Sequence, residues 1–475
     1  MGYALPGPTT TTGSWDKLFS SGQIFRNQTG EAYADTMDID GTRKILPIEG
    51  RQFGNLLTRM YCMRFGRMPA KKEISELRFQ INAWADISPR RIMHLRTAQH
   101  DGRIYYSLGD DLGSIVEIRP GAWSVGRTEN VYFANRPLGG QQVLPTPTSG
   151  DSDLRRRLFQ FVNLINPDDQ LLFLAYLATC IVPEIAHPAC LLVGGEGSAK
   201  SSTARIVKAL IDPANIDLLG FPEKDTDLAQ ICSHNHMAVF DNLARMSRTQ
   251  SDVLCRAVTG GAMSKRRLYS DADDFNFTFQ GCVVLTSINL VAEQPDLLDR
   301  SLLFRMPRIS PDTRQCESIY WQEFQKTRPL LLGWIFDILA KAMEILPTVK
   351  VENLPRLADF YRWGIAISGA LGESDSAFLT AFGQNRQKIN EALLDANSLA
   401  STLVDFMSSQ AKWEGTATEL LNELIKLSGA KTLPKAANQL SRQLKEIETT
   451  LGKSGIGLQW GRYSDRNVAK ITLVR

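Results

Sequence analysis

A glycine-rich segment between an apolar run and a helical pattern constrains this chain most. Residues 190–193 are apolar, 194–199 read Gly-Gly-Glu-Gly-Ser-Ala, and Lys200-Ser201 opens a stretch of helical periodicity that reaches residue 211. Strand, loop and helix in this order typify a phosphate-binding loop, because backbone N–H groups at a helix N-terminus can surround a phosphate. We therefore predict a nucleotide site at Gly194, Gly195, Glu196, Gly197, Ser198, Ala199, Lys200, Ser201 and Ser202.

The chemistry of this loop fits a nucleotide with its magnesium ion. The amine of Lys200 would reach the β- and γ-phosphates, and the hydroxyl of Ser201 would bind Mg²⁺. The sequence departs from G-x-x-x-x-G-K-[ST] at one place, where Ala199 replaces the last glycine. This alanine is expected to narrow the approach of the backbone to the phosphates.

A second apolar run, residues 237–240, ends in Asp241-Asn242. A buried parallel strand that ends in a carboxylate presents it at the carboxyl edge of the sheet, next to the phosphate loop. Asp241 is therefore predicted to hold Mg²⁺ together with Ser201. Asn242 stands where a second acid usually polarises the attacking water, which leaves the general base unassigned.

Two further residues are predicted to complete a hydrolytic site. Asn289 follows a third apolar run, 281–288, and could orient the attacking water or contact the γ-phosphate, or simply cap the turn. The segment 296–305 carries Arg300 and Arg305, which cannot easily fold back onto their own phosphate loop. Such a cation serves a neighbouring subunit as an arginine finger, and we favour Arg300 over Arg305.

Between these strands, residues 259–279 are expected to form a β-hairpin that carries Lys265, Arg266 and Arg267 beside Tyr269. Cations next to an aromatic ring suit phosphate contact and base stacking on single-stranded nucleic acid. An exposed basic loop without a ligand is the alternative.

Composition places the chain among ordinary globular proteins of more than one domain. It has 475 residues, a net charge of +3 and 43% hydrophobic residues, with no apolar run long enough for a membrane span. The N-terminus lacks the features of a signal peptide, and the seven cysteines are scattered without a CxxC pair. We therefore expect a cytoplasmic protein with reduced cysteines and no membrane partner.

Basic residues gather near both ends of the chain. Residues 51–105 carry eleven Lys or Arg against four acids, and residues 412–475 carry eleven against six. Ordinary solvated surfaces would explain either end alone, but together they favour a polyanionic partner.

The chain divides into four predicted regions. They are a basic mixed α/β domain with a flexible start at 1–150, a nucleotide-binding α/β core at 151–315, a helical lid at 316–410 and a winged helix at 411–475. In the first region, Asp38-Ile-Asp40 has the spacing of a metal-binding carboxylate pair, although a hairpin end beside Gly41 is the plainer interpretation.

These motifs together resemble a known family of proteins. The phrases at 194–201, 239–242, 259–261 and 298–300 are similar to those of AAA+ P-loop NTPases, in particular the replicative helicases and primase-helicases of phages and mobile elements, which are similar to superfamily 3 and minichromosome-maintenance helicases. The resemblance implies a homo-hexameric ring, ATP with Mg²⁺ bound between subunits, and DNA in a central channel. It also implies that Lys265, Arg266 and Arg267 lie on a translocating hairpin.

The expected function is ATP-dependent unwinding of DNA during replication of a phage or mobile element, with single-stranded or forked DNA as partner. The residues expected to act on ATP are Lys200, Asp241, Asn242, Asn289 and Arg300. One alternative is an initiator or loader in which ATP acts as an assembly switch, and another is a defence ATPase that senses foreign DNA.

Overall fold

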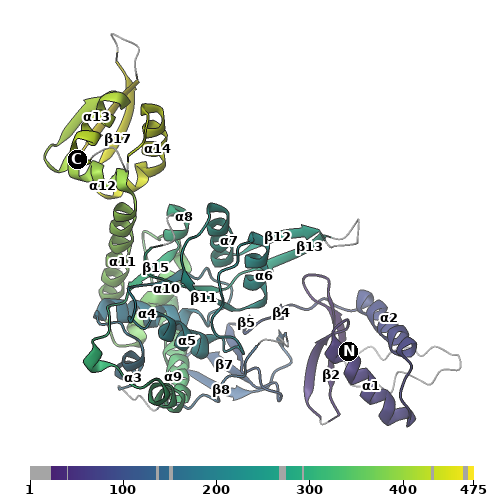
Figure 1. Ribbon diagram of the computed structural model, residues 1–475. Helices are drawn as coiled ribbons and strands as arrows, with labels where there is room; N and C mark the ends of the chain where they lie inside the picture. Colours follow the sequence, from purple (N-terminus) through teal and green to yellow (C-terminus); the bar gives the residue numbers. More distant parts are fainter. Residues whose placement is uncertain are drawn as a thin grey trace.

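Four parallel strands form the central sheet of the computed structural model, which describes residues 23–39, 41–134, 139–148, 153–266, 274–290, 294–428, 433–463 and 469–475 (Figure 1). Their order across the sheet is β11 (Met237–Leu243), β14 (Cys282–Ser287), β10 (Ala189–Val193) and β15 (Ser301–Arg305). The three apolar runs predicted as strands are thus confirmed. Nearly continuous apolar sequence is what parallel strands need when helices cover both faces.

Helices pack around this sheet and share its core. α5 (Lys200–Ile211) lies against β11 and β14, α7 (Arg248–Thr259) against β14, and α11 (Asp375–Ala396) against β15. The others in this part are α3 (Leu154–Phe161), α4 (Pro167–Thr179), α6 (Asp225–His234), α8 (Pro295–Leu298), the short turn η2 (Pro311–Thr313), α9 (Glu317–Ile345), the short turn η3 (Leu346–Thr348) and α10 (Ala358–Ala370). The result is a mixed α/β fold with a parallel sheet, as predicted.

One apolar core runs through most of these elements. Its buried residues extend from Ile104 to Ala392, so it crosses the predicted boundaries at 150 and 315. It includes residues of an antiparallel sheet of β5 (Thr97–His100), β6 (Arg103–Ser107), β7 (Ile115–Arg119) and β8 (Ala122–Gly126). β7 and β8 pack on α9, which ties this sheet to the helices. The division into domains stays a prediction.

The N-terminal part adds a second small α/β unit. The antiparallel strands β1 (Gln23–Arg26), β2 (Ala32–Met37) and β3 (Arg43–Pro47) pack with α1 (Arg51–Phe65) and α2 (Lys71–Ile87), and β4 (Met93–His94) pairs with β9 (Tyr132–Phe133). Asp38 is buried here and bonds to Lys44 at 2.8 Å and Arg59 at 3.0 Å, while Asp40 lies outside the described residues. Two cations on Asp38 favour the hairpin interpretation over a metal pair.

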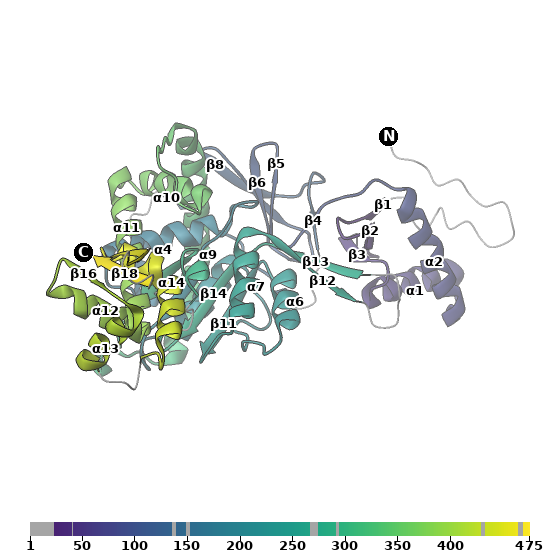
Figure 2. The same ribbon diagram turned by 90° about the horizontal axis from the view of Figure 1, so that it is seen from above.

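A hairpin of β12 (Gly261–Arg266) and β13 (Asp274–Phe279) leaves the body next to α6. In both views it projects on the side on which β1–β3 lie (Figure 1, Figure 2). The antiparallel register pairs Gly261 with Phe279 and Arg266 with Asp274, which confirms the predicted hairpin.

The C-terminal part has its own apolar core. α12 (Ser398–Ser408), α13 (Ala417–Ser428) and α14 (Ala437–Lys453) pack with an antiparallel sheet of β16 (Lys412–Gly415), β18 (Ala469–Val474) and β17 (Gly457–Arg462). β17 and β18 form an antiparallel hairpin, and β16 pairs with the other side of β18. The core begins at Leu399, inside the region predicted as the lid. None of the helices in the described part of the chain is long and apolar enough to cross a membrane.

Candidate nucleotide-binding site

The loop between β10 and α5 has a backbone that demands glycine at specific positions. A Cβ at Gly194 would lie 2.4 Å from the carbonyl oxygen of Met306, and Gly197 has a φ of +74°. Ala199 adopts φ 63° and ψ 26°, the left-handed region in which an L-residue with a side chain is strained. The sequence indicated a narrowed approach at Ala199, and the structure adds the backbone conformation that makes glycine the usual residue there.

Lys200 folds over the mouth of this loop. Its Nζ donates to the carbonyl oxygens of Gly194 and Gly195, both at 2.8 Å, and lies 3.3 Å from Oγ of Ser198. A cation in this position, at the first turn of a helix, meets an anion together with the free N–H groups of that turn. Lys200 thus lies over the loop at the start of α5, and its contact with phosphates stays a prediction.

Ser201 and Asp241 meet at the carboxyl edge of the sheet. Oγ of Ser201 donates to the carboxylate of Asp241 at 2.9 and 3.0 Å, and Oγ1 of Thr286 on β14 donates to the same carboxylate. A carboxylate and hydroxyls converging beside a phosphate loop are oxygen donors of the kind Mg²⁺ prefers. The donor set fits the predicted metal, and Thr286 is a member that the motif search missed.

Asn242 follows Asp241 with a backbone that leaves the regular strand. Its φ is 56°, its N–H donates to Oγ1 of Thr286 at 2.8 Å, and the pairing of β11 with β14 shifts between Phe240 and Leu243. Asparagine tolerates this left-handed conformation better than most residues. The side chain of Asn242 is exposed, and an amide there cannot take a proton from water as a carboxylate would.

Asn289 lies beyond the end of β14 and faces a pocket. The pocket has a volume of about 680 Å³ and is lined by Asn289, Gly194 and Arg305 among others. The backbone carbonyl of Asn289 accepts a hydrogen bond of 2.6 Å from Ser287. The predicted water-orienting residue and the phosphate loop thus border one space at the same edge of the sheet.

Arg300 lies at the opposite edge. It precedes β15, a strand parallel to β10, whereas Arg305 ends β15 opposite Val193, next to the loop. Nη1 of Arg300 binds the carboxylate and the carbonyl oxygen of Asp296, and only 13% of its side chain is exposed. The hydrogen bond from Arg300 lowers the pKa of Asp296. Arg300 does not join the other predicted residues in the same chain.

Two of the three predicted DNA-binding cations lie in the hairpin. Lys265 and Arg266 are the last two residues of β12, and Arg267 lies outside the described residues.

Asn163 ties the phosphate loop to the segment after β15. Its Nδ2 donates to the carbonyl oxygens of Ser198 at 3.0 Å and Pro307 at 2.7 Å. Sequence reasoning missed Asn163, because it belongs to no motif and lies two residues after the end of α3.

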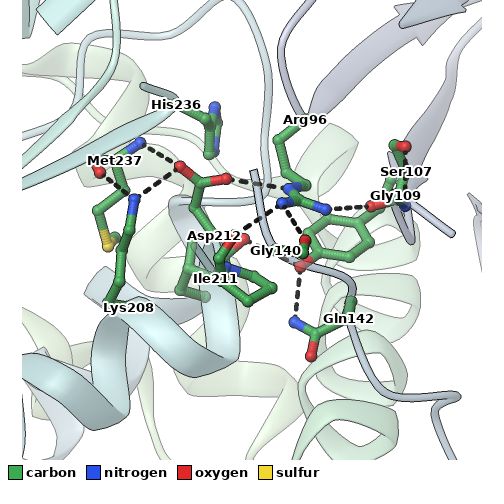
Figure 3. A network of polar contacts seen from close by, with 12 residues as sticks. Arg96, Ser107, Gly109, Gly140, Gln142, Lys208, Ile211, Asp212, His236 and Met237 are labelled. Carbon is green, nitrogen blue, oxygen red and sulfur yellow. Dashed lines mark hydrogen bonds and ion pairs between the residues drawn. The ribbon is translucent and has the colours of Figure 1, made fainter. Parts of the chain in front are cut away.

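The other end of α5 is held by a buried network that sequence reasoning also missed (Figure 3). The carboxylate of Asp212 accepts hydrogen bonds from Arg96 Nε and Lys208 Nζ, both at 3.0 Å, and from the N–H of Met237 at 3.1 Å. These three ionic side chains are at most 2% exposed. Arg96 also donates to the carbonyl oxygens of Ser107 and Gly140 at 3.0 Å and of Pro213 at 3.1 Å.

The last carbonyl groups of α5 find partners from distant segments. Gln142 donates to Ala209 and Leu210, Arg328 of α9 donates to Ala209, and the hydroxyl of Tyr106 donates to Ile211. Burial raises the pKa of Tyr106, which keeps the hydroxyl protonated as a donor. These contacts fix α5, and with it Lys200 and Ser201, to β5–β8, β11 and α9.

Comparison with solved structures gives matches of low identity over nearly the whole chain. The structure described as "SCCmec type IV Cch - active helicase" is 12% identical, aligns with 95% of this chain and 92% of its own, and has a TM-score of 0.49. The A form apo structure of the NrS-1 C-terminal region is 11% identical, with 97% and 98% covered and a TM-score of 0.45. No curated protein matches the chain significantly.

Two family models match on either side of the junction between α11 and α12. Residues 155–381 match the replication protein of actinomycete integrative conjugative elements, and residues 399–475 match the C-terminal domain of that protein. The second match begins where the C-terminal apolar core begins, at Leu399. Since both models describe one protein and together span more than half of the sequence, this chain belongs to the family of replication proteins of actinomycete integrative conjugative elements.

Proposed function

We propose that this replication protein is an ATP-hydrolysing DNA helicase that acts on single-stranded or forked DNA. The observation that carries the proposal is the convergence of Lys200, Ser201 and Asp241 at the carboxyl edge of one parallel sheet. A lysine, a hydroxyl and a carboxylate at a glycine-rich loop bind a nucleoside triphosphate with its metal ion. Membership of a replication-protein family favours DNA as the polymer on which hydrolysis is used.

In this proposal each residue has one task. The N–H groups of 194–202 and the amine of Lys200 hold the phosphates of ATP, and Ser201 and Asp241 hold Mg²⁺, which neutralises charge on the phosphates when bound. Asn289 orients the attacking water. The shape of the loop is set by its remaining residues, Gly194, Gly195, Glu196, Gly197, Ser198, Ala199 and Ser202. Because the amide of Asn242 cannot accept a proton, the acceptor would be water or a group of a neighbouring subunit.

The proposed assembly is a homo-hexameric ring of the AAA+ type. Arg300 lies across the sheet from its own loop, which is the placement expected of a cation that completes a neighbour's site. It is paired with Asp296 at present, and Arg356, 43% exposed, binds the same carboxylate at 2.8 Å. We expect the carboxylate of Asp296 to release one of these two arginines when the subunits assemble. Lys265, Arg266 and Arg267 would contact DNA, α9–α11 would serve as the lid, and residues 411–475 as a winged helix.

The test is ATP hydrolysis and unwinding of a forked DNA duplex by the full chain and by Lys200→Ala. We expect hydrolysis that single-stranded DNA stimulates, and its loss by about a hundredfold or more in Lys200→Ala, because a charge-assisted contact to the phosphates disappears. Lys341→Ala, at an exposed lysine of α9, is the control and should keep wild-type activity. Wild-type protein that neither unwinds DNA nor responds to it would overturn the helicase proposal.

A second function, an initiator or loader that uses ATP as an assembly switch, is favoured by Asn242. Without a second acid, hydrolysis is slow, and slow hydrolysis suits a switch. Unwinding by the combined variant Lys265→Ala, Arg266→Ala and Arg267→Ala distinguishes the two. A helicase loses unwinding when these cations are removed, whereas a loader that unwinds nothing by itself shows nucleotide-dependent assembly in both forms.

A further inference from the structure

The segment after β15 forms a wall along the phosphate loop. The N–H of Met306 donates to the carbonyl oxygen of Val193 at 2.8 Å, and the N–H of Ile309 donates to that of Gly197 at 3.0 Å. Asn163 adds the bridge between Ser198 and Pro307 described above. Two backbone hydrogen bonds and the side chain of Asn163 thus fix residues 306–309 to the loop.

Two arginines of this wall lie beside Gly197. A Cβ built on Gly197 would be 3.2 Å from Nη2 of Arg314 and 3.9 Å from Nε of Arg308. The short turn η2 reverses the chain after Ile309, with N–H groups of Thr313 and Arg314 bonded to Ser310 and Pro311, and so returns Arg314 to the loop. Gly197, with φ +74°, leaves this side of the loop open to both guanidinium groups.

The charges of these arginines are uncompensated. Both side chains are exposed, and neither forms an ion pair or a side-chain hydrogen bond with any residue in the part of the chain that the structure describes. Two guanidinium groups held near one loop without an ion pair repel each other, and an anion placed between them removes this cost. The planar guanidinium group also matches the oxygens of a phosphate in bidentate fashion.

We infer that Arg308 and Arg314 contact the polyphosphate chain of the nucleotide from the same subunit that supplies the phosphate loop. The inference rests on the proposed nucleotide binding at 194–202. It assigns two cations to phosphate binding that lie outside every motif in the sequence. Together with Lys200 they surround the nucleotide phosphates, and Arg300 is left to a neighbouring subunit.

The experiment measures displacement of a fluorescent ATP analogue from the full chain by ATP and by inorganic tripolyphosphate, which has phosphates but no base or sugar. The variants are Arg308→Gln, Arg314→Gln, the double variant and Lys200→Ala, with Arg119→Gln as a control at an exposed arginine on β7. We expect each single wall variant to weaken ATP and tripolyphosphate alike, by about tenfold, because one charge-assisted contact is lost. The urea midpoint of each variant should equal that of the wild type.

Each result decides the matter. A double variant that binds both competitors as tightly as Arg119→Gln overturns the inference and leaves the phosphate loop in place. A loss for ATP with no loss for tripolyphosphate also overturns it, because the arginines would then contact the base or sugar. Wild-type protein that binds neither competitor overturns the proposed nucleotide site and the inference together.

Discussion

The charged side chains at the two ends of α5 differ in whether they are paired. At the N-terminal end, Nζ of Lys200 donates to carbonyl oxygens, and Arg308 and Arg314 lie nearby without an ion pair to any residue that the structure describes. At the C-terminal end, the charges of Arg96 and Lys208 are buried and hydrogen bonded to the carboxylate of Asp212 (Figure 3). One helix thus has an end with excess positive charge beside solvent and an end with paired charge away from it.

The difference follows from what each end must do. A buried charge is tolerated only when it is paired and its remaining hydrogen-bonding groups are satisfied, and Asp212 meets this condition with three donors. A site that binds an anion gains from cations that the protein itself leaves unpaired. Under the proposed function, rigid support at one end of α5 would let the other end remain incomplete until a nucleotide binds.

The largest effect on this comparison is expected from Asp212→Ala. The change leaves Arg96 and Lys208 buried without their carboxylate, and we expect the free energy of unfolding to fall by about 3–5 kcal/mol. Urea denaturation followed by circular dichroism measures the loss. Asp252→Ala, at an exposed position of α7, should change stability by less than about 0.5 kcal/mol.

A companion variant separates lost charge pairing from lost packing. Arg96→Met, Lys208→Met and Asp212→Leu together remove all three charges and keep apolar volume. Buried ion groups replaced in this way often lose little stability, so the triple variant should recover most of the loss seen with Asp212→Ala. If it is as unstable as Asp212→Ala, the network acts through shape and not through charge.

A smaller effect is expected from Gln142→Leu. The amide of Gln142 donates to the carbonyl groups of Ala209 and Leu210 and accepts from Arg328 at 2.7 Å. Leucine removes these bonds, so the carbonyl of Leu210 loses its side-chain partner, while Ala209 and Arg328 remain bonded to each other. The expected loss is about 1–3 kcal/mol in the same assay. Gln99→Leu, at an exposed position of β5, serves as the control, and an equal loss in both variants would argue against a role for Gln142 in closing the helix.

The site at the N-terminal end of α5 could be predicted from the sequence because the residues that form it lie in short local motifs. Lys200 and Ser201 follow the glycine-rich loop, three and four residues after Gly197, and Asp241 ends an apolar strand whose place in a parallel sheet follows from its pattern. The hairpin at 261–279 and the helices of the C-terminal part were likewise predictable from periodicity and turn residues.

The network at the C-terminal end of α5 could not be predicted, because its residues come from segments far apart in the chain. Arg96, Gln142 and Arg328 each look like an ordinary polar residue in the sequence, and only the fold brings them to residues 208–212. The same holds for Arg308 and Arg314, whose closeness to Gly197 depends on the parallel pairing of β10 with β15. Local patterns identify a motif, whereas its supporting residues depend on tertiary contacts.

The smallest effect is expected from Ala199→Gly, which tests the backbone strain at the N-terminal end of α5. Ala199 is held at φ 63°, which costs an L-residue about 1–2 kcal/mol, and glycine removes this cost while adding about 0.4–1 kcal/mol of unfolded-state entropy. Ala199→Gly should therefore raise the free energy of unfolding by about 0.5–1 kcal/mol and bind ATP at least as tightly as the wild type. Asn242→Gly, at φ 56°, is the matched comparison, and because asparagine tolerates this conformation it should gain less. A lower stability of Ala199→Gly in urea would show that the methyl group of Ala199 contributes packing that outweighs the strain of its backbone.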